Sequence, residues 1–170
     1  LVLDNYEELL RSGGEAAKSA IRAKIDEQLN AWVTGSGGLL LKYSRDRYLL
    51  ICDEQFFHRM VEEKFSVLES IHQVVSEDGV SASLSIGIGK DCGAYEESFR
   101  WAEKAIEMAL SRGGDQAVVK DSLDFQFYGG RSKSTEKRTK VKSRVMANAL
   151  GELIADAGQV YVMGHEYADM

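Results

Sequence analysis

The sequence predicts an α+β fold, in which one β-sheet carries packed helices and is followed by a C-terminal linker helix and strand. Apolar residues recur at helical spacing in several long segments, whereas other segments alternate or run apolar over roughly four to eight residues, as strands do. The two kinds of segment alternate along the chain, which favours a sheet covered by helices. Hydrophobic residues make up 44% of the 170 residues, enough for a packed core.

The N-terminal segment is expected to hold a short strand and a long helix. Leu1–Asp4 is an apolar run of the kind that forms a buried strand. Over residues 15–33, apolar side chains recur every three or four positions and form one stripe, made of Ile21, Ile25, Leu29 and Trp32. The glycine-rich segment 35–38 ends this predicted helix.

A hairpin and a second long helix follow. Residues 39–43 and 47–52 are apolar runs around a short polar turn, which indicates a hairpin. The turn lacks the glycines that tight hairpins use, so its chemistry needs an explanation. Asp53 is a suitable N-cap. The helix behind it is predicted to continue to Ser76 with these residues facing inward: Phe57, Val61, Phe65, Leu68 and Ile71.

A further strand, a helix and a strand pair complete the predicted domain. Residues 82–89 alternate and end on glycines, as a strand does. Residues 95–111 are predicted to form a helix that ends at Gly113-Gly114. Two short strands are expected at 116–120 and 123–127. The core face of the helix is expected to consist of Phe99, Ala102, Ile106 and Ala109.

Charge is distributed unevenly along the chain, whose formal net charge is −6. Residues 131–144 hold seven Lys or Arg and a single Glu, between acidic stretches at 1–130 and 145–170. One interpretation is a solvated linker that its own charge keeps extended. The other is a surface for a phosphate-rich or anionic ligand. Aromatic side chains do not interleave with the basic ones, so no nucleic-acid partner is expected. A helix at about 141–157 and a strand at 159–163 follow.

Composition excludes several classes of protein. No apolar run approaches the roughly 18 residues that a membrane-spanning helix needs. The first residues lack the basic region of a signal peptide. Because the chain begins inside an apolar run, it is expected to be a fragment of a longer protein. Cys52 and Cys92 form no CxxC pair, which suits a reducing compartment and disfavours a disulfide framework or a zinc site.

Several motifs together resemble a known family. The order of strand, helix and hairpin, with Asp4 on the first strand, resembles the GGDEF domain, the fold of diguanylate cyclases. The segments LSIGIG (84–89) and AEKAIEMALSRGGDQAVV (102–119) are similar to that family's motifs. The resemblance covers essentially all 170 residues. Four segments resemble a subgroup of the family, the GdpP-type cyclic di-AMP phosphodiesterases. They are LSRGGDQ (110–116), FYGG (127–130), EKRT (136–139) and VMGH (162–165).

The resemblance implies an architecture, partners and a location. Members of the subgroup are membrane-anchored bacterial proteins with a transmembrane segment, a PAS domain, a degenerate GGDEF domain and a DHH–DHHA1 phosphoesterase. Residues 1–130 would be the degenerate GGDEF domain with its nucleotidyl-cyclase-like sheet, 131–144 a basic linker, and 145–170 the truncated start of the DHH domain. The implied partners are the upstream PAS domain, the downstream DHH–DHHA1 domain and a second copy in a homodimer. The implied location is the cytoplasmic portion of the membrane-anchored protein.

The hairpin departs from the cyclase pattern at its functional positions. Active members carry glycines in the turn and a glutamate that binds Mg²⁺ together with an aspartate of the first strand. Aligned on its flanking tyrosines, the turn here reads Ser44-Arg45-Asp46-Arg47. Arg47 takes the place of that glutamate and Val2 that of the aspartate, while Asp4 falls on a second, non-ligating aspartate. Because Mg²⁺ needs oxygen ligands, the alignment predicts no diguanylate cyclase activity.

Arg45, Asp46 and Arg47 form a candidate nucleotide-binding site. Arginine holds phosphate through paired donors, and the family's degenerate domain is associated with weak ATPase activity, with ATP and Mg²⁺ as ligands. The alternative is that both arginines are solvated turn residues paired with Asp46. Three functions therefore stay open: a regulatory module of a phosphodiesterase, a nucleotide-binding weak ATPase, and a dimerisation scaffold without a ligand. No catalytic residue and no resident cofactor are predicted in the fragment itself.

The C-terminal segment VYVMGHEYADM resembles the first motif of a DHH phosphoesterase. His165 and Asp169 match two positions that bind Mn²⁺ in that motif, and imidazole and carboxylate ligands suit a two-manganese hydrolase. The chain ends at Met170, before the next aspartate of the motif. These two residues are therefore expected to bind manganese only in the complete DHH domain.

The remaining histidines, tryptophans and Cys52 are expected to be structural. His58 and His72 fall on one predicted helix, about 21 Å apart at helical rise, so they cannot share a metal ion. Trp32 and Trp101 fit helix faces, and Cys52 is expected to pack as a small apolar side chain.

Overall fold

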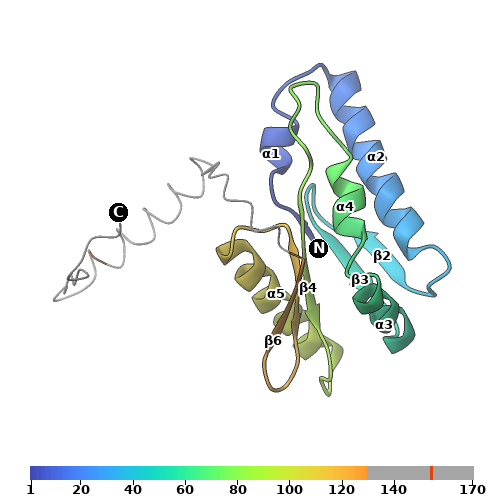
Figure 1. Cartoon of the computed structure of the whole chain (residues 1–170), viewed down its shortest axis with the longest axis vertical. Helices are drawn as coiled ribbons and strands as arrows, with labels where there is room; N and C mark the ends of the chain where they lie inside the picture. The colour runs from blue at the N-terminus through green and yellow to red at the C-terminus, as the bar shows by residue number, and fades with distance from the viewer. Residues whose placement is uncertain (130–153, 155–170) are drawn as a thin grey trace. The chain divides into compact units, whose positions relative to one another are not determined.

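The structure, a computed structural model, describes residues 1–129 and Ile154 (Figure 1). The predicted α+β class is confirmed. The chain divides into two units, residues 1–131 and 132–170. Ile154 is helical; the rest of the helix expected at 141–157, the basic segment and the strand expected at 159–163 lie outside the described residues. The elements are β1 (Val2–Leu3), α1 (Tyr6–Leu9), α2 (Glu15–Val33), β2 (Leu39–Lys42), β3 (Tyr48–Ile51), α3 (Glu54–Glu62), α4 (Val67–His72), β4 (Leu84–Gly89), α5 (Tyr95–Ser111), β5 (Gln116–Lys120) and β6 (Phe125–Gly129).

The strands form a four-stranded sheet and a separate hairpin. The sheet order is β1-β4-β5-β6; β4 and β5 are parallel, and the outer strands pair antiparallel to them. Helix α5 connects the two parallel strands. The predicted hairpin is confirmed as β2–β3, whose last pair is Lys42 with Tyr48. An isolated antiparallel bridge between Val2 and Arg47 joins it to β1. The single predicted sheet is therefore realised as two pieces that meet at the start of β1.

The main core lies between the sheet and the helices α2, α3 and α4. The predicted apolar stripe of α2 is confirmed at Ile21, Ile25 and Leu29, which are buried. Trp32 is only half-buried and packs against Phe56, with ring centroids 5.4 Å apart. The buried members of this cluster include, from the other elements, Leu3, Tyr6, Leu9, Tyr48, Met60, Phe65, Ile71, Leu84, Ile86 and Val119.

The predicted helix from Asp53 to Ser76 is wrong in its middle, where the structure has two helices. Asp53 caps α3 as expected, since its carboxylate accepts the Phe56 N–H at 2.8 Å. Lys64 and Phe65 then adopt positive φ angles of 51° and 54°, which break the helix. Phe65 is 1% exposed and lies against the ring of Tyr128 on β6 at 5.1 Å. Burial of this ring outweighs the strain of the left-handed conformation.

The break also changes which side of the segment faces inward. Phe56 and Met60 are the buried residues of α3, whereas Phe57 and Val61, predicted for that face, are only half-buried. The predictions for Phe65, Leu68 and Ile71 are confirmed. The two histidines do not share one helix as expected, since one lies on α3 and the other ends α4.

Helix α5 approaches β4 closely because two strand residues lack side chains. A Cβ at Gly87 would lie 2.2 Å from the Ala102 carbonyl oxygen, and one at Gly89 would lie 2.1 Å from that of Ser98. Ile106 and Ala109 are buried as predicted, together with Ala105. The prediction for Phe99 is wrong: its side chain is 38% exposed, because the helix contacts the strand through backbone atoms beside it.

The last strand starts later than the predicted range 123–127. Leu123 is 91% exposed and lies in a turn before β6. The Asp121 carboxylate accepts the N–H groups of Asp124 at 2.9 Å and Leu123 at 2.8 Å, which closes the turn. These bonds, first the one from Asp124, hold the pKa of Asp121 below its usual value.

Among the helices of the described residues, none is both long and apolar enough to cross a membrane.

Candidate functional site

The hairpin tip, defined as Ser44–Arg47, lies beside the start of β1. Val2 and Arg47 face each other across an antiparallel bridge. Main-chain hydrogen bonds hold the two strands on either side, from Leu3 N–H to the Asp46 carbonyl at 2.9 Å and from Tyr48 N–H to the Leu1 carbonyl at 3.0 Å. The two positions that the cyclase pattern reserves for carboxylates are therefore direct neighbours here, and they hold an aliphatic side chain and a guanidinium.

The backbone of the turn explains why it has no glycine. None of the residues Ser44–Arg47 has a positive φ. The loop is closed by the Tyr43 N–H, which donates to the Arg47 carbonyl at 3.2 Å, and by the Ser44 hydroxyl, which donates to the Asp46 carboxylate at 3.2 Å. A five-residue hairpin loop in this conformation has no position that only glycine can occupy.

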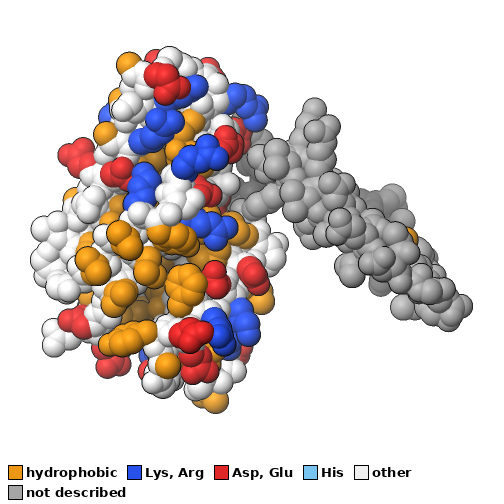
Figure 2. All heavy atoms as spheres, turned by 180° about the vertical axis from the view of Figure 1, so that it is seen from behind, with side chains coloured by type: hydrophobic (Ala, Val, Ile, Leu, Met, Phe, Trp, Pro, Cys, Tyr) orange, Lys and Arg blue, Asp and Glu red, His pale blue; other side chains and the backbone are white. Residues whose placement is uncertain are grey.

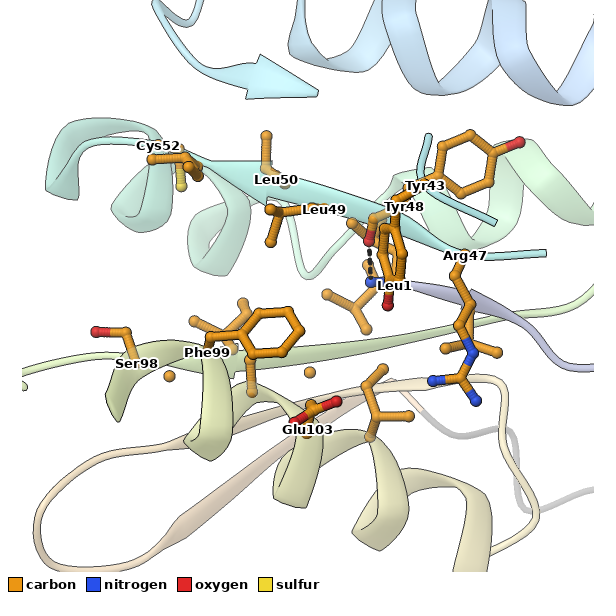
Figure 3. A pocket seen from close by; sticks show the side chains of 18 of the residues that line it. Leu1, Tyr43, Arg47, Tyr48, Leu49, Leu50, Cys52, Ser98, Phe99 and Glu103 are labelled. Atoms are coloured by element: carbon orange, nitrogen blue, oxygen red, sulfur yellow. Dashed lines mark hydrogen bonds between the residues drawn. The ribbon is translucent and has the colours of Figure 1, made fainter. Parts of the chain in front are cut away.

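The structure does not bring the three predicted nucleotide-binding residues into one cluster. The Arg45 side chain is 82% exposed, and its guanidinium lies 4.0 Å from the equally solvated Glu7 carboxylate. Arg47 points instead into the space between β3 and α5 (Figure 3), where it lines a pocket that Arg45 and Asp46 do not reach. Of the candidate trio, only Arg47 belongs to a concave site.

This pocket has a volume of about 580 Å³ and mostly apolar walls. One wall comes from β3, with Leu49 and Ile51, and another from α5, with Phe99 and Ile106; β4 forms the floor. The charged residues of the lining are Arg47, Glu96, Glu103 and Glu107. Figure 2 shows hydrophobic side chains gathered around a hollow on the face opposite to that of Figure 1. The exposed large hydrophobic residues include Leu39, Leu41, Tyr43, Ile51, Tyr95 and Phe99.

A polar contact that the sequence did not reveal holds the hairpin on α2. The Tyr48 hydroxyl donates to the Asp26 carboxylate at 2.5 Å, and the Lys42 Nζ atom lies 3.0 Å from the same carboxylate oxygen. Burial, together with this hydrogen bond, raises the pKa of Tyr48. These contacts hold the hairpin against α2 close to its tip.

Asp4 lies at the centre of a second polar cluster, which we call the Asp4 corner and define as Asp4, His72, Ser83 and Asp115. The Asp4 carboxylate accepts the Asp115 N–H at 2.9 Å and the Ser83 hydroxyl at 3.2 Å. The His72 Nε2 atom lies 2.6 Å from the Asp115 carboxylate. The corner therefore ties together β1, α4, the start of β4 and the turn before β5.

The LSRGGDQ motif builds this corner. Gly113 and Gly114 have φ angles of 107° and 78°, and a Cβ at Gly114 would lie 2.6 Å from an Asp4 carboxylate oxygen. The buried Gln116 side chain donates to the Ala109 carbonyl at 3.1 Å. The sequence revealed the motif but not the bonds of Ser83 and Asp115 to Asp4, nor the contact of His72 with Asp115, because only the folded chain brings these positions together.

The residues at the cyclase metal position do not fit Mg²⁺. Neither Val2 nor Arg47 supplies an oxygen ligand, and the guanidinium repels a cation. The Asp4 carboxylate already accepts hydrogen bonds within its corner. Across the described residues, no group of three or more His, Cys, Asp or Glu side chains could hold a metal ion. His165 and Asp169, the residues predicted to bind manganese, lie outside the described residues.

Comparison with known proteins agrees with this fold and motif set. Residues 1–127 match the family model described as the GGDEF domain of cyclic-di-AMP phosphodiesterase GdpP-like proteins. The chain is 36% identical over its whole length to the cyclic-di-AMP phosphodiesterase GdpP of Geobacillus thermodenitrificans and 33% identical to that of Bacillus subtilis. It is 37% identical to the cyclic-di-AMP phosphodiesterase PdeA of Listeria monocytogenes.

The chain spans 26% of the length of each of these relatives. They are thus larger proteins, of which the region compared here is one part. The family model covers most of the chain, and the relatives align along all of it. The chain therefore belongs to the GGDEF-domain family of the GdpP-like cyclic-di-AMP phosphodiesterases.

Proposed function

We propose that this chain is a regulatory module of a larger cyclic-di-AMP phosphodiesterase and that it has no diguanylate cyclase activity. In this sense it is a degenerate GGDEF domain, which has the fold of the family but not the metal ligands of the cyclase reaction. Its role is to pass a conformational input from an upstream domain to a downstream catalytic domain.

The observation that carries this proposal is the isolated bridge between Val2 of β1 and Arg47, the residue before β3. In a working cyclase, two carboxylates at such neighbouring positions would hold Mg²⁺ between them. Here a fixed positive charge faces an aliphatic side chain, so a divalent cation and the triphosphate that it would carry have no ligands. Two-metal phosphoryl transfer therefore cannot start at this position.

The regulatory role also depends on the other domains of the complete protein. Because the chain spans 26% of its relatives, a regulatory role requires partner domains. We expect a PAS domain on the input side, a membrane anchor that leaves this domain in the cytoplasm, and a DHH–DHHA1 phosphoesterase on the output side. His165 and Asp169 would contribute to the manganese site of that phosphoesterase only when the complete domain is present.

A product assay tests the loss of cyclase activity. The 170-residue chain is incubated with GTP and Mg²⁺, and in parallel with ATP and Mg²⁺, and the products are separated by chromatography. We expect no cyclic dinucleotide above the level of a protein-free control. Formation of a cyclic dinucleotide in proportion to protein concentration would refute the proposal.

The regulatory role is tested in the complete phosphodiesterase that contains this chain. Arg47→Glu reverses the charge at the hairpin tip, whereas Arg100→Glu reverses an exposed charge on α5 as a matched control. We expect the first variant to change the rate of cyclic di-AMP hydrolysis at unchanged manganese content, and the second to leave the rate unaltered. Equal rates in both variants and the wild type would contradict a role of the hairpin in regulation.

A second candidate function, nucleotide binding with weak ATPase activity, is favoured by the position of Arg47. Within the described residues, no carboxylate lies at ion-pair distance from its guanidinium, which points into the pocket (Figure 3). Arg47 is therefore available to a phosphate. The glutamates that line the same pocket oppose this, because they repel an anion. The third function, a dimerisation scaffold without a ligand, stays a prediction that light scattering can test.

Titration of ATP into the chain, with measurement of phosphate release, separates the first two functions. An ATPase predicts saturable binding that Arg47→Ala weakens and that Arg45→Ala weakens less. The regulatory module without a nucleotide predicts no saturable heat and no release of phosphate.

A further inference from the structure

We propose that the free edge of β6 is a self-association surface, at which two copies of this chain pair their β6 strands antiparallel and join their sheets into one. We call this surface, made of the outward-facing main-chain groups of Phe125–Gly129, the β6 edge. The inference assigns a definite surface to self-association, and it does not depend on the loss of cyclase activity.

Strand β6 ends the four-stranded sheet on one side. Among the strands of the described residues it pairs with β5 alone (Figure 1). Its residues pair with consecutive residues of β5, from Phe125 opposite Lys120 to Gly129 opposite Gln116, so no bulge bends the strand away. One side of the β6 backbone therefore has no partner strand in this part of the chain.

Two hydrogen bonds identify which main-chain groups of β6 point outward. In the turn before β6, the Asp121 N–H donates to the Asp124 carbonyl at 3.2 Å, so these two residues form a hydrogen-bonded pair. On the other side of β5, the Lys90 N–H donates to the Lys120 carbonyl at 3.1 Å, so Lys120 bonds toward β4. Because the two directions alternate along a strand, every second residue of β6 turns its main-chain groups to the β6 edge. These residues are Phe125, Phe127 and Gly129.

Most of these groups are open to a partner strand. The Phe125 N–H donates to the Asp124 carboxylate at 2.7 Å, which also shows that it points away from β5. Within residues 1–129, no hydrogen bond engages the outward N–H of Phe127 or of Gly129. The Phe127 side chain is 40% exposed, and Gly129 is exposed as well. Two donors of the edge are therefore accessible.

The β6 edge is complementary to itself. In an antiparallel pair centred on Phe127, this residue lies opposite Phe127 of the second copy, and Phe125 lies opposite Gly129. Each Phe127 N–H then donates to the Phe127 carbonyl of the other copy, and each Gly129 N–H donates to a Phe125 carbonyl. A two-fold axis relates the copies, as in most homodimers. The one outward N–H that this pairing would leave over, that of Phe125, already has its acceptor in Asp124.

The side chains of β6 also favour a second copy. The strand reads FQFYG and has neither a charge nor a proline, which are features that usually protect a free edge. The two Phe127 rings would face each other, and aromatic cross-strand pairs stabilise antiparallel sheets. The Arg112 guanidinium lies over this ring, 4.2 Å from its centroid, so the two guanidinium groups would approach each other. Because salt screens their repulsion, the pairing should tighten as the ionic strength rises.

Strand β2 also has a free edge, and it provides an internal control. The Tyr43 N–H donates to the Arg47 carbonyl, so by alternation Leu40 and Lys42 turn their main-chain groups away from β3. Unlike β6, this strand carries a charge, on Lys42, and a lysine on an edge strand opposes pairing with another chain. We therefore expect the β2 edge to stay unpaired.

The complex of the isolated chain is expected to be weak. Strands of five residues share few ladder bonds, which places this interface among the small, transient ones. Where other domains of the complete protein hold two copies close together, the effective concentration reaches the millimolar range and stabilises the same pairing. The β6 edge is therefore suited to respond to an input that brings two copies together or apart.

Light scattering and amide hydrogen exchange test the proposal on the full 170-residue chain, at about 10 µM and about 1 mM. At the higher concentration we expect the scattering mass to rise toward that of a dimer. The amides of Phe127 and Gly129 should then exchange at least about threefold more slowly, and added salt should slow them further. The Leu40 amide on β2 should exchange at the same rate at both concentrations.

Phe127→Lys tests the centre of the pairing. It places two ammonium groups opposite each other, so we expect it to abolish both the rise in mass and the protection of Gly129. Leu123→Lys is the matched control, because it puts the same charge on a side chain that is 91% exposed in the turn outside the strand. Urea unfolding of both variants shows whether they fold, and the concentration dependence of the wild type tests the proposal without them.

Three results would overturn the proposal. The first is a monomer at both concentrations with unchanged exchange of Phe127. The second is a dimer in which Leu40 or other amides gain protection and Phe127 does not, because the contact would then lie elsewhere. The third is a Phe127 amide that is already protected in the monomer, which would assign the β6 edge to a segment of the same chain. None of these results bears on cyclase activity, so the two proposals fail separately.

Discussion

The Asp4 corner and the hairpin tip are built around two nearby residues, Asp4 and Val2, and they differ in their chemistry. At the corner, the Asp4 carboxylate is present and accepts the Asp115 N–H and the Ser83 hydroxyl. At the tip, Val2 and Arg47 occupy the positions where a cyclase needs its carboxylates. A carboxylate is therefore present where a backbone N–H donates to it, whereas an aliphatic side chain and a guanidinium face each other at the tip.

The corner is therefore expected to contribute more to the free energy of folding than the tip does. The corner provides hydrogen-bond partners for half-buried backbone and side-chain groups from four separate parts of the chain, so changes there leave polar groups without partners. The tip is a solvated turn with one half-buried arginine, so changes there should affect ligands and partner domains more than stability.

The largest effect is expected for Gly114→Ala in the motif that builds the corner. The new Cβ would lie 2.6 Å from the Asp4 carboxylate, at a φ of 78°. We expect a loss of about 3 kcal/mol of unfolding free energy in urea titrations, from strain and displacement of the carboxylate together. Gly93→Ala is the matched control, because nothing lies within 4 Å of its new Cβ. A similar loss in both variants would contradict the role given to the corner.

Asp4→Asn tests the charge at the same place. The amide keeps the size of the side chain but weakens the bonds from the Asp115 N–H and the Ser83 hydroxyl, so we expect a loss of about 2 kcal/mol. Asp46→Asn at the exposed hairpin tip should stay within about 0.5 kcal/mol of the wild type. The contrast between corner and tip breaks down if the two variants are equally destabilised in urea.

Tyr48→Phe tests how the hairpin is held on α2. Loss of the hydroxyl that donates to Asp26 should cost about 1 kcal/mol at neutral pH. Because folding raises the pKa of Tyr48 above its ordinary value of 10.0, the native state binds that proton more tightly than the unfolded chain does. The stabilisation is therefore complete below pH 10 and is lost as the pH rises further.

Thermal unfolding measured from about pH 8 to about pH 11, a range around the ordinary pKa of tyrosine, tests this loss of stability at alkaline pH. The wild type should lose stability toward the alkaline end faster than Tyr48→Phe. Parallel curves for the two proteins would show that the hydroxyl does not titrate as described.

The smallest effect is expected at the tip itself. Arg45→Ala removes a side chain that is 82% exposed and makes one solvated ion-pair contact. We expect a change within about 0.5 kcal/mol of unfolding free energy. A loss of unfolding free energy as large as that of Asp4→Asn would mean that the turn stabilises the fold as much as the corner does.

The elements that could be predicted from the sequence are those whose signals are local. The helices Glu15–Val33 and Tyr95–Ser111, the hairpin and the Asp53 cap follow from periodicity, glycines and capping chemistry. The break at Phe65 could not be predicted, because a buried phenylalanine in the left-handed region is stabilised by Tyr128, far away in the chain.

Part of the candidate site could likewise be predicted from the sequence, and part depends on contacts between distant segments. The positions of Val2 and Arg47 followed from the family resemblance, and the structure places them opposite each other. The contacts of this cluster could not be predicted, since Ser83 and Asp115 reach Asp4, and His72 reaches Asp115, only through the packing of α4, β4 and the turn after α5. The pocket between β3 and α5 depends on strand and helix packing that no local pattern encodes.

Loss of the metal site is tested by calorimetric titration of the preformed Mg²⁺ complex of a non-hydrolysable GTP analogue into the 170-residue chain, with excess Mg²⁺ in both solutions. With a valine and an arginine where the metal ligands of a cyclase lie, no saturable heat is expected at any concentration of the complex. A saturable one-to-one heat that Arg47→Ala alters would contradict the account, because it would place a nucleotide-bound metal ion at the hairpin tip.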